Sequence, residues 1–420
     1  MKRFFAILCC LCVVAMAAAQ GASTNIPVGS WVGKLNVGAA SLTLVFHIKQ
    51  EAGIVKSTLD SPDQGAKGLG VYNEYLSADS VSLKMAQLGA MYRAKVCGNK
   101  MVGTFSQFGA NYPLTLERGD YKPRRPQTPS APYPYKTEEV KFVNSTDNAT
   151  LAGTLVYPVG YKEGSRPPVV IMVSGSGLQN RDEEIFDHKP FLVIADYLAR
   201  HGIASLRYDD RAFGASVGGN RIHAKATTLD YRRDAEAGVA YLRSLKKFGA
   251  VGVVGHSEGG NIAFMLGGAK VVDFVVSLAA VGTRVDVALT AQYNRIMELQ
   301  GRPTKIDVVG YRQIALSSNS AWMSWFIDYD PTADIAATTC PTFALNGGRD
   351  CQVISSLNMP AIKRALPYNE RSLVKEYPML NHLFQHCTTG APTEYNTIEE
   401  TISADVLNDM VRWINGVTGR

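Results

Sequence analysis

Apolar and polar residues alternate with a period of two along the first part of the chain. The alternating runs lie at residues 30–37, 41–50, 53–61, 80–87, 91–107 and 112–119. Because successive side chains of a strand face opposite sides of a sheet, this period is typical of half-buried strands. The sequence therefore predicts a small antiparallel β domain over residues 25–120.

A proline-rich segment follows this region, at residues 121–136. It contains Pro123, Pro126, Pro129, Pro132 and Pro134. Proline lacks a backbone N–H and fixes φ, so closely spaced prolines exclude helices and paired strands and favour an extended, stiff chain. We expect a spacer between two domains.

Beyond this segment, short apolar runs without alternation are separated by helical patterns. The apolar runs lie at residues 167–175, 203–210, 251–255, 272–280, 341–348 and 371–378. The helical patterns lie at residues 189–202, 227–247, 261–269, 358–367 and 403–417. Apolar runs of this kind are typical of parallel strands that are covered on both faces. The alternation predicts an α/β domain over residues 137–420, with a mostly parallel sheet and helices on both sides.

A long insertion separates two of the predicted strands. About 60 residues lie between the run that ends near Ala280 and the one that begins near Cys340, far more than an ordinary connection needs. We expect a helical cap at about residues 282–335. Its large apolar side chains either line an acyl pocket or pack the cap against the core; they are Met297, Trp322, Trp325 and Phe326.

One short motif carries the main chemical signal. Gly255-His256-Ser257-Glu258-Gly259 has the spacing G-x-S-x-G and lies between a predicted buried strand and a predicted helix. A serine in such a sharp strand-to-helix turn is exposed as a nucleophile, and the crowded turn favours glycine two residues before and after it. The sequence predicts that Ser257 is the nucleophile and that the His256 side chain points away from it.

A serine nucleophile needs a base, and the base needs an acid that orients it. On this architecture the order along the chain is serine, acid, histidine. Asp350 follows the strand at residues 341–348, and His382 follows the last predicted strand. We therefore predict an Asp350–His382 pair beside Ser257. His386 is the competing base, and the competing acids precede the strand instead of ending it; they are Asp330 and Asp334.

The developing oxyanion needs two N–H donors. The first predicted donor is the backbone N–H of Glu258, and the second is that of Ser176 in the glycine-rich loop Ser174-Gly175-Ser176-Gly177. Gly177 or Leu178 replaces Ser176 if the loop is one residue out of register. The loop lacks the spacing of a phosphate-binding loop. We expect no metal and no organic cofactor.

The first residues have the features of a signal peptide over residues 1–19. Lys2 and Arg3 precede an apolar stretch, which ends in the cleavage pattern Ala17-x-Ala19. The stretch is shorter than the roughly 20 residues of a membrane anchor. Its cysteines lie too early for a lipoprotein signal. We expect a periplasmic or secreted protein, and no later stretch is apolar enough to span a membrane.

Charge adds little to this picture. The chain has 43 Lys and Arg against 37 Asp and Glu, a balance that does not predict nucleic acid or an anionic membrane as partner. Four of the seven cysteines lie beyond the predicted signal: Cys97, Cys340, Cys351 and Cys387. Four cysteines in so long a chain do not predict a disulfide scaffold.

Several motifs together resemble a known family. "GHSEGG", "SGSGLQNRDE", "LRYDDRAFGAS", "LNGGRDCQV" and the C-terminal segment from "LNHLFQH" resemble secreted bacterial α/β-hydrolases of the esterase D type, also described as serine aminopeptidase-like or feruloyl-esterase-like. The resemblance covers about residues 136–420, and the β domain is also similar. It implies the α/β-hydrolase fold and the triad Ser257, Asp350 and His382. Ala212 stands where the family usually has glycine.

Two cysteines depart from the family pattern and suggest a disulfide. Cys351 directly follows Asp350, and Cys387 lies five residues after His382. If Asp350 and His382 are in contact, these cysteines lie on neighbouring loops, within the roughly 5.5 Å Cα separation of a disulfide. Cys97 and Cys340 would then stay as buried thiols.

These observations predict a secreted serine carboxylic-ester hydrolase that acts through an acyl-enzyme on short-chain acyl esters. The alternative is a serine peptidase or aminopeptidase acting on short peptides. An acyl-CoA thioesterase is disfavoured by the signal peptide, and a non-catalytic carbohydrate-binding protein by the intact triad. The sequence does not indicate an oligomeric state.

Overall fold

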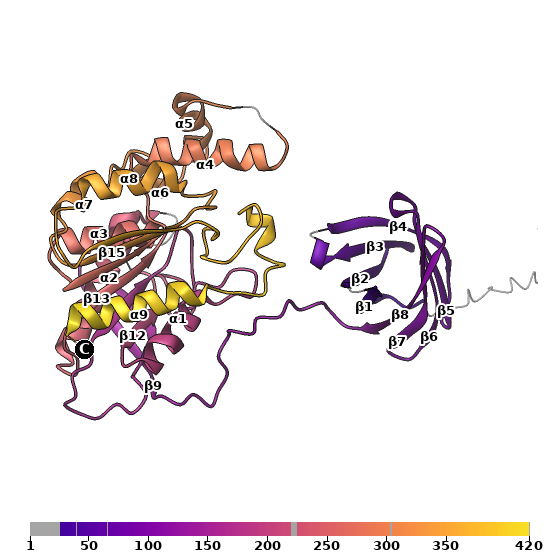
Figure 1. Ribbon diagram of the computed structural model, residues 1–420, viewed down its shortest axis with the longest axis horizontal. Helices are drawn as coiled ribbons and strands as arrows, with labels where there is room; N and C mark the ends of the chain where they lie inside the picture. The colour runs from indigo at the N-terminus through magenta and orange to yellow at the C-terminus, as the bar shows by residue number, and fades with distance from the viewer. Residues whose placement is uncertain (1–25, 39, 65, 220–224, 303–304, 420) are drawn as a thin grey trace, which may run out of the picture. The chain divides into compact units, whose positions relative to one another are not determined.

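The computed structural model describes residues 26–38, 40–64, 66–219, 225–302 and 305–419 (Figure 1). The predicted signal peptide lies outside these residues. The chain divides into two compact units, of which the first ends at Lys122 and the second begins at Pro123. In the described ranges, no helix is both long and apolar enough to cross a membrane.

The first unit is a closed barrel of antiparallel strands. The strands are β1 (Gly29–Val37), β2 (Ala40–Glu51), β3 (Ile54–Ser61), β4 (Ala66–Leu76), β5 (Ser80–Met85), β6 (Ala90–Cys97), β7 (Lys100–Gln107) and β8 (Ala110–Arg118). Each strand pairs with the next, and β1 closes the barrel on β8 through Trp31 and Arg118. Closure leaves no unpaired sheet edge. The prediction of an antiparallel β domain is confirmed.

One barrel strand, β4, is not indicated by the alternation pattern of the sequence. Its side chains are only partly buried or exposed, and Gly68 and Gly70 interrupt the alternation on which the prediction depended. The run at residues 91–107 forms two strands, β6 and β7, because the chain turns at Gly98 with φ near +60°.

Large side chains fill the barrel interior. Trp31, Phe46 and Tyr92 are fully buried, and the Tyr92 hydroxyl donates to the carbonyl oxygens of Met101 and Leu114. The polar end of this tyrosine is therefore satisfied inside an otherwise apolar core.

The second unit is built on an eight-stranded sheet in the order β16-β15-β14-β13-β11-β12-β10-β9. The strands are β9 (Thr137–Asn144), β10 (Ala149–Val156), β11 (Val169–Val173), β12 (Ala204–Tyr208), β13 (Val251–His256), β14 (Phe274–Leu278), β15 (Thr342–Gly347) and β16 (Leu373–Tyr377). Strands β11 to β16 are mutually parallel, as predicted, whereas β9 and β10 form an antiparallel hairpin at one edge. The apolar pattern does not predict this hairpin, because Ala, Gly and Thr weaken the apolar signal of β10.

Helices cover both faces of the sheet (Figure 1). They are α1 (Pro190–Arg200), α2 (Thr228–Ser244), α3 (Glu258–Gly268), α8 (Ser355–Ala365) and α9 (Ala404–Thr418). Phe191 of α1 and Met410 of α9 share one buried cluster with the sheet. Val239 of α2 and Ile262 of α3 belong to a second cluster on the other face. This two-sided α/β architecture confirms the predicted α/β-hydrolase fold.

The insertion between β14 and β15 is helical. It contains α4 (Val285–Leu299), α5 (Val308–Leu316), α6 (Ala321–Phe326) and α7 (Thr332–Ala337). A small cluster around Val285, Phe326 and Val353 packs this insertion against the loop after β15.

The proline-rich segment lacks helix and strand, but it is not a free spacer. From Pro123 onward it belongs to the second unit. The Arg125 guanidinium donates to the carbonyl oxygens of Phe186, Asn396 and Ile398, and the Gln127 amide to that of Ile402. Hydrogen bonds from polar residues between the prolines therefore anchor the segment.

Candidate active site

Ser257 occupies a strained turn between β13 and α3. Its φ of 55° and ψ of −119° lie in a region that residues other than glycine rarely adopt. The backbone holds this conformation: Ser257 N–H donates to the Leu278 carbonyl at 2.8 Å, and Gly260 N–H donates to the Ser257 carbonyl at 2.9 Å. The local geometry is that of the predicted nucleophile elbow.

The two glycines of the motif are required by close backbone contacts. A Cβ on Gly255 would lie 2.0 Å from the carbonyl oxygen of Gly259, and a Cβ on Gly259 would lie 2.0 Å from that of Val173. Because backbone atoms occupy both positions, no side-chain movement could relieve such a clash. The G-x-S-x-G spacing therefore has a steric cause here.

Asp350 and His382 are brought together by the loops that follow β15 and β16. His382 Nδ1 lies 2.7 Å from Asp350 Oδ2, and both side chains are buried. Asp350 Oδ1 accepts the backbone N–H groups of Gln352 and Val353 at 2.7 and 2.8 Å. These bonds fix the carboxylate, which in turn fixes the imidazole ring.

Ser257 and His382 line the same cavity of about 310 Å³. Among the described residues, no hydrogen bond joins the Ser257 hydroxyl to the His382 ring. Catalytic hydrogen bonds of this kind often tighten only when substrate binds. The arrangement therefore brings the predicted nucleophile and base to one site.

The competing residues lie elsewhere. The His386 side chain is 60% exposed and pairs with Glu400, with 2.9 Å between Nδ1 and Oε2. Asp334 accepts the Tyr329 hydroxyl, and Asp330 accepts the Thr332 N–H. None of these three residues lines the cavity.

The glycine-rich loop after β11 lies against the nucleophile. A Cβ on Gly175 would be 3.2 Å from Ser257 Cβ. The Gly175 N–H already donates to Glu183 Oε1 at 2.8 Å, so it is not free to bind an oxyanion. Gly175 and Ser176 line the cavity, whereas Gly177 and Leu178 do not. This placement favours the predicted donor Ser176 over its two alternatives.

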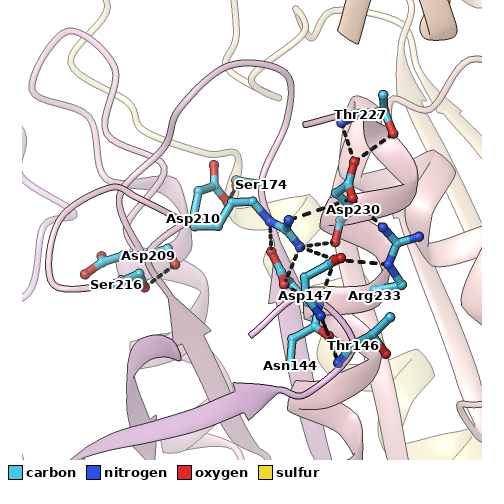
Figure 2. Close-up of polar contacts among 12 residues, drawn as sticks. Asn144, Thr146, Asp147, Ser174, Asp209, Asp210, Ser216, Thr227, Asp230 and Arg233 are labelled. Atoms are coloured by element: carbon cyan, nitrogen blue, oxygen red, sulfur yellow. Dashed lines mark hydrogen bonds and ion pairs between the residues drawn. The ribbon is translucent and has the colours of Figure 1, made fainter. Parts of the chain in front are cut away.

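Two carboxylates at the end of β12 hold this loop in place. Asp210 accepts the Ser174 hydroxyl at 3.2 Å (Figure 2). It also accepts the Gln179 N–H at 2.8 Å. Asp209 accepts the backbone N–H and the guanidinium of Arg181. Burial raises the pKa of Asp210 well above its usual range. Both residues belong to "LRYDDRAFGAS", one of the motifs that carry the family resemblance, so this motif positions the glycine-rich loop after β11.

Ala212, which departs from the family pattern, has a φ of 59°. The turn therefore keeps the left-handed conformation that explains the usual glycine, and alanine adopts it under strain.

The Glu258 side chain connects the elbow to the helical insertion. Its Oε1 accepts the Thr228 hydroxyl at 2.6 Å and the Trp322 indole N–H at 2.8 Å. Burial raises the pKa of Glu258, and hydrogen bonds, including one from Ser176, partly offset this effect. Trp322 of α6 is therefore fixed above the site by a polar bond as well as by packing.

The four apolar side chains predicted for the pocket divide into two groups. Trp322 and Phe326 line the cavity and stack on each other, with ring centroids 5.0 Å apart. Met297 and Trp325 do not line it, and Trp325 stacks on Tyr329.

Sequence reasoning missed the roles of His256 and Glu183. The sequence predicts only that the His256 side chain points away from Ser257. In the structure His256 borders the cavity, and its ring contacts Glu183 and the His382 carbonyl. The signal lay in the residue order: His256 directly precedes the nucleophile, and Glu183 lies in the "RDEE" run after the oxyanion loop.

The predicted disulfide is wrong. Cys351 Sγ donates to the Gly390 carbonyl at 3.1 Å and Cys387 Sγ to the Met379 carbonyl, so the two thiols have separate partners. Burial raises their pKa values to about 12 and about 11. Cys97 and Cys340 are free thiols, but Cys97 is exposed and Cys340 only partly buried. Within the described ranges, no cluster of three or more His, Cys, Asp or Glu side chains could hold a metal ion.

Comparison with known proteins identifies related hydrolases. Residues 189–324 match the family described as Serine aminopeptidase, S33. The chain is 25% identical to esterase EstD of Thermotoga maritima over 278 residues, which cover 63% of this chain and 65% of that relative. The match thus spans slightly less than two thirds of the relative's length.

Solved structures with a similar chain include two esterases. Est1E of Butyrivibrio proteoclasticus with bound ferulic acid is 17% identical and covers 66% of this chain and 99% of its own, with a TM-score of 0.45. The Pyrococcus furiosus esterase Pf2001 is 18% identical and covers 72% and 99%, also with a TM-score of 0.45.

Proposed function

We propose that this chain, an α/β-hydrolase of the esterase D type, cleaves carboxylic esters through an acyl-enzyme formed on Ser257. The family match and the relation to esterase EstD support an ester-hydrolase chemistry. The observation that carries the proposal is geometric: the strained Ser257 turn and the Asp350-bound His382 border one cavity.

The reaction follows from the positions of the groups. Ser257 Oγ attacks the ester carbonyl carbon while His382 Nε2 takes the hydroxyl proton, and Asp350 stabilises the imidazolium that forms. The N–H groups of Glu258 and Ser176 bind the oxyanion of the tetrahedral intermediate. When the intermediate collapses, His382 returns the proton to the leaving alcohol. Water then attacks the acyl-enzyme with His382 as base and releases the acid and free Ser257.

The size and the wall of the cavity favour substrates with short acyl groups. Its volume of about 310 Å³ lies at the lower end of ligand pockets. Part of its wall is apolar, with Val281, Leu289 and Phe326, and Trp322 is held there by Glu258. A long acyl chain would have to displace this wall.

The peptidase alternative has one observation in its favour. Two carboxylates, Glu183 and Glu258, line the cavity and are of the type that holds a peptide's free amine. Both already accept protein hydrogen bonds, Glu183 from Gly175 and Glu258 from Thr228. We therefore favour ester cleavage.

Substrate panels separate the two activities. On p-nitrophenyl esters from acetate to palmitate, we expect kcat/KM to be highest for acetate to butyrate and to fall with longer chains. Aminoacyl and peptidyl anilides should be cleaved more slowly than the short esters. Faster cleavage of anilides than of esters would show that the protein is a peptidase. If the wild-type protein cleaves neither class, both proposed activities are wrong.

We further propose export from the cytoplasm, based on the first nineteen residues. Protein from the periplasm or medium of its native host should begin at Gln20 when its N-terminus is sequenced. Recovery from the cytosol with Met1 intact would contradict export.

A further inference from the structure

A second pair of imidazole and carboxylate lies beside the nucleophile and borders the same cavity. His256 ends β13 directly before Ser257, and Glu183 lies in the loop after β11. His256 Nδ1 is 2.9 Å from Glu183 Oε1, and its Nε2 is 2.9 Å from the carbonyl oxygen of His382. The two side chains are only 9% and 6% exposed.

Both ring nitrogens of His256 therefore face acceptors. The His382 carbonyl cannot donate a proton, so His256 Nε2 must carry one. If the other nitrogen were bare, its lone pair would face a carboxylate oxygen that already accepts the Gly175 N–H. The pair must thus hold one proton more than a neutral imidazole beside a carboxylate. Placing it on His256 gives a charge-assisted hydrogen bond.

The charges around the ring agree with this assignment. Burial alone would lower the pKa of His256, but the charge and hydrogen bond of Glu183, the His382 carbonyl and the charge of Asp350 raise it above its usual value. The His382 ring is also close, with its centroid 4.7 Å from that of His256.

The pair also connects the segments that form the site. Glu183 accepts the N–H of Gly175 in the oxyanion loop, and His256 binds the backbone of the catalytic base. Glu183 itself has a φ of 52°, which is unusual for a residue other than glycine. Its N–H donates to the Asn180 carbonyl at 2.9 Å, which helps to hold that conformation.

We propose that Glu183 and a doubly protonated His256 form a positioning pair, which fixes the oxyanion loop and the backbone of His382 around Ser257. The kinetic part of this inference rests on the proposed ester hydrolysis. The protonation state of His256 does not depend on it.

Another buried histidine provides an internal control. His188 Nδ1 lies 3.0 Å from the Thr401 hydroxyl, which can donate to it, and Nε2 lies 2.9 Å from the Tyr395 carbonyl. Nε2 also lies 3.0 Å from the Gln385 amide nitrogen, and none of these three partners is a carboxylate. Burial lowers the pKa of His188 to about 4. The same protein should therefore contain one charged and one neutral buried histidine.

The first test is NMR of the full chain with ¹⁵N-labelled histidine at pH 7. Resonances are assigned from their loss in His256→Asn and His188→Asn. We expect both ring nitrogens of His256 to be protonated and His188 to be a neutral tautomer. A neutral His256 ring at pH 7 would overturn the proposal, whether or not the protein proves to be an esterase.

The second test is kinetic and uses Glu183→Gln, which keeps an acceptor but removes the charge. We expect kcat for a short ester to fall by up to about 100-fold with little change in KM, because the reacting groups are misplaced while the pocket stays intact. The alkaline limb of the pH profile should move to lower pH. The negative charge of Glu183 raises the pKa of His256, and without it His256 loses its second proton at a lower pH.

The matched control is Glu184→Gln, the adjacent exposed residue, which pairs with Lys189. It should retain wild-type kcat and pH profile. Two further measurements distinguish misplaced reacting groups from an unfolded protein. They are the labelling of Ser257 by a fluorophosphonate and the melting temperature of each variant. If folded Glu183→Gln matches Glu184→Gln in kcat and in the alkaline limb, the pair has no positioning role.

Discussion

Ser257→Ala should lower kcat/KM for the preferred short-chain ester by roughly 10⁴- to 10⁶-fold while leaving the protein folded. The fold should tolerate this change, because the Ser257 hydroxyl makes no hydrogen bond among the described residues that alanine would remove. His382→Ala and Asp350→Asn should also cause losses of orders of magnitude. The effects should not add, because the three residues act as a unit. Initial rates, with circular dichroism for folding, measure this outcome.

His386→Ala is the control for the assignment of the base. Because His386 is exposed and bound to Glu400 away from the cavity, its loss should leave ester turnover unchanged. A fluorophosphonate should label the wild type but not Ser257→Ala. Wild-type activity in Ser257→Ala, or an inactive His386→Ala beside an active His382→Ala, would contradict the proposed triad.

Arg211→Met should destabilise the second unit by about 3–5 kcal/mol. The Arg211 side chain is fully buried and donates to both carboxylate oxygens of Asp234, to Asp147 and to the Asp230 carbonyl. Asp147 and Asp230 also pair with Arg233 (Figure 2). Without Arg211, a buried negative charge loses its main counter-charge, whereas the methionine fills much of the volume.

Denaturant unfolding, with the transition of the second unit analysed separately, measures this effect. The difference in the free energy of unfolding between Arg211→Met and wild type should become smaller as the pH falls. Burial already raises the pKa of Asp234, and protonation removes its unpaired charge. Arg243→Met is the control: this exposed residue pairs with Asp273, and its loss should cost less than about 1 kcal/mol. If Arg211→Met and Arg243→Met lose the same free energy of unfolding, the buried ion pairs of Arg211 have no special stabilising role.

Local sequence patterns predicted the fold class and the residues proposed for the site, although they did not indicate β4 or the β9–β10 hairpin. The six parallel strands could be predicted because the pattern of a buried β-branched run depends little on distant residues. The Ser257 turn could be predicted because strand, glycine and helix signals lie within about fifteen residues. Asp350 and His382 followed from chain order at the ends of parallel strands. The comparisons confirm the fold and family resemblance, whereas the catalytic roles stay predictions that the variants above test.

Only the tertiary structure decided the features that depend on direction and long-range contact. His256 and Glu183 are 73 residues apart, and Arg125 and Ile398 are 273 apart. Loop adjacency alone could not tell that Cys351 and Cys387 bind different carbonyl groups. The period of a pattern fixes which face a side chain occupies in a strand or helix. In turns and loops the direction of a side chain is set by whichever distant donor or acceptor the folded chain brings near, and the sequence does not specify that partner locally.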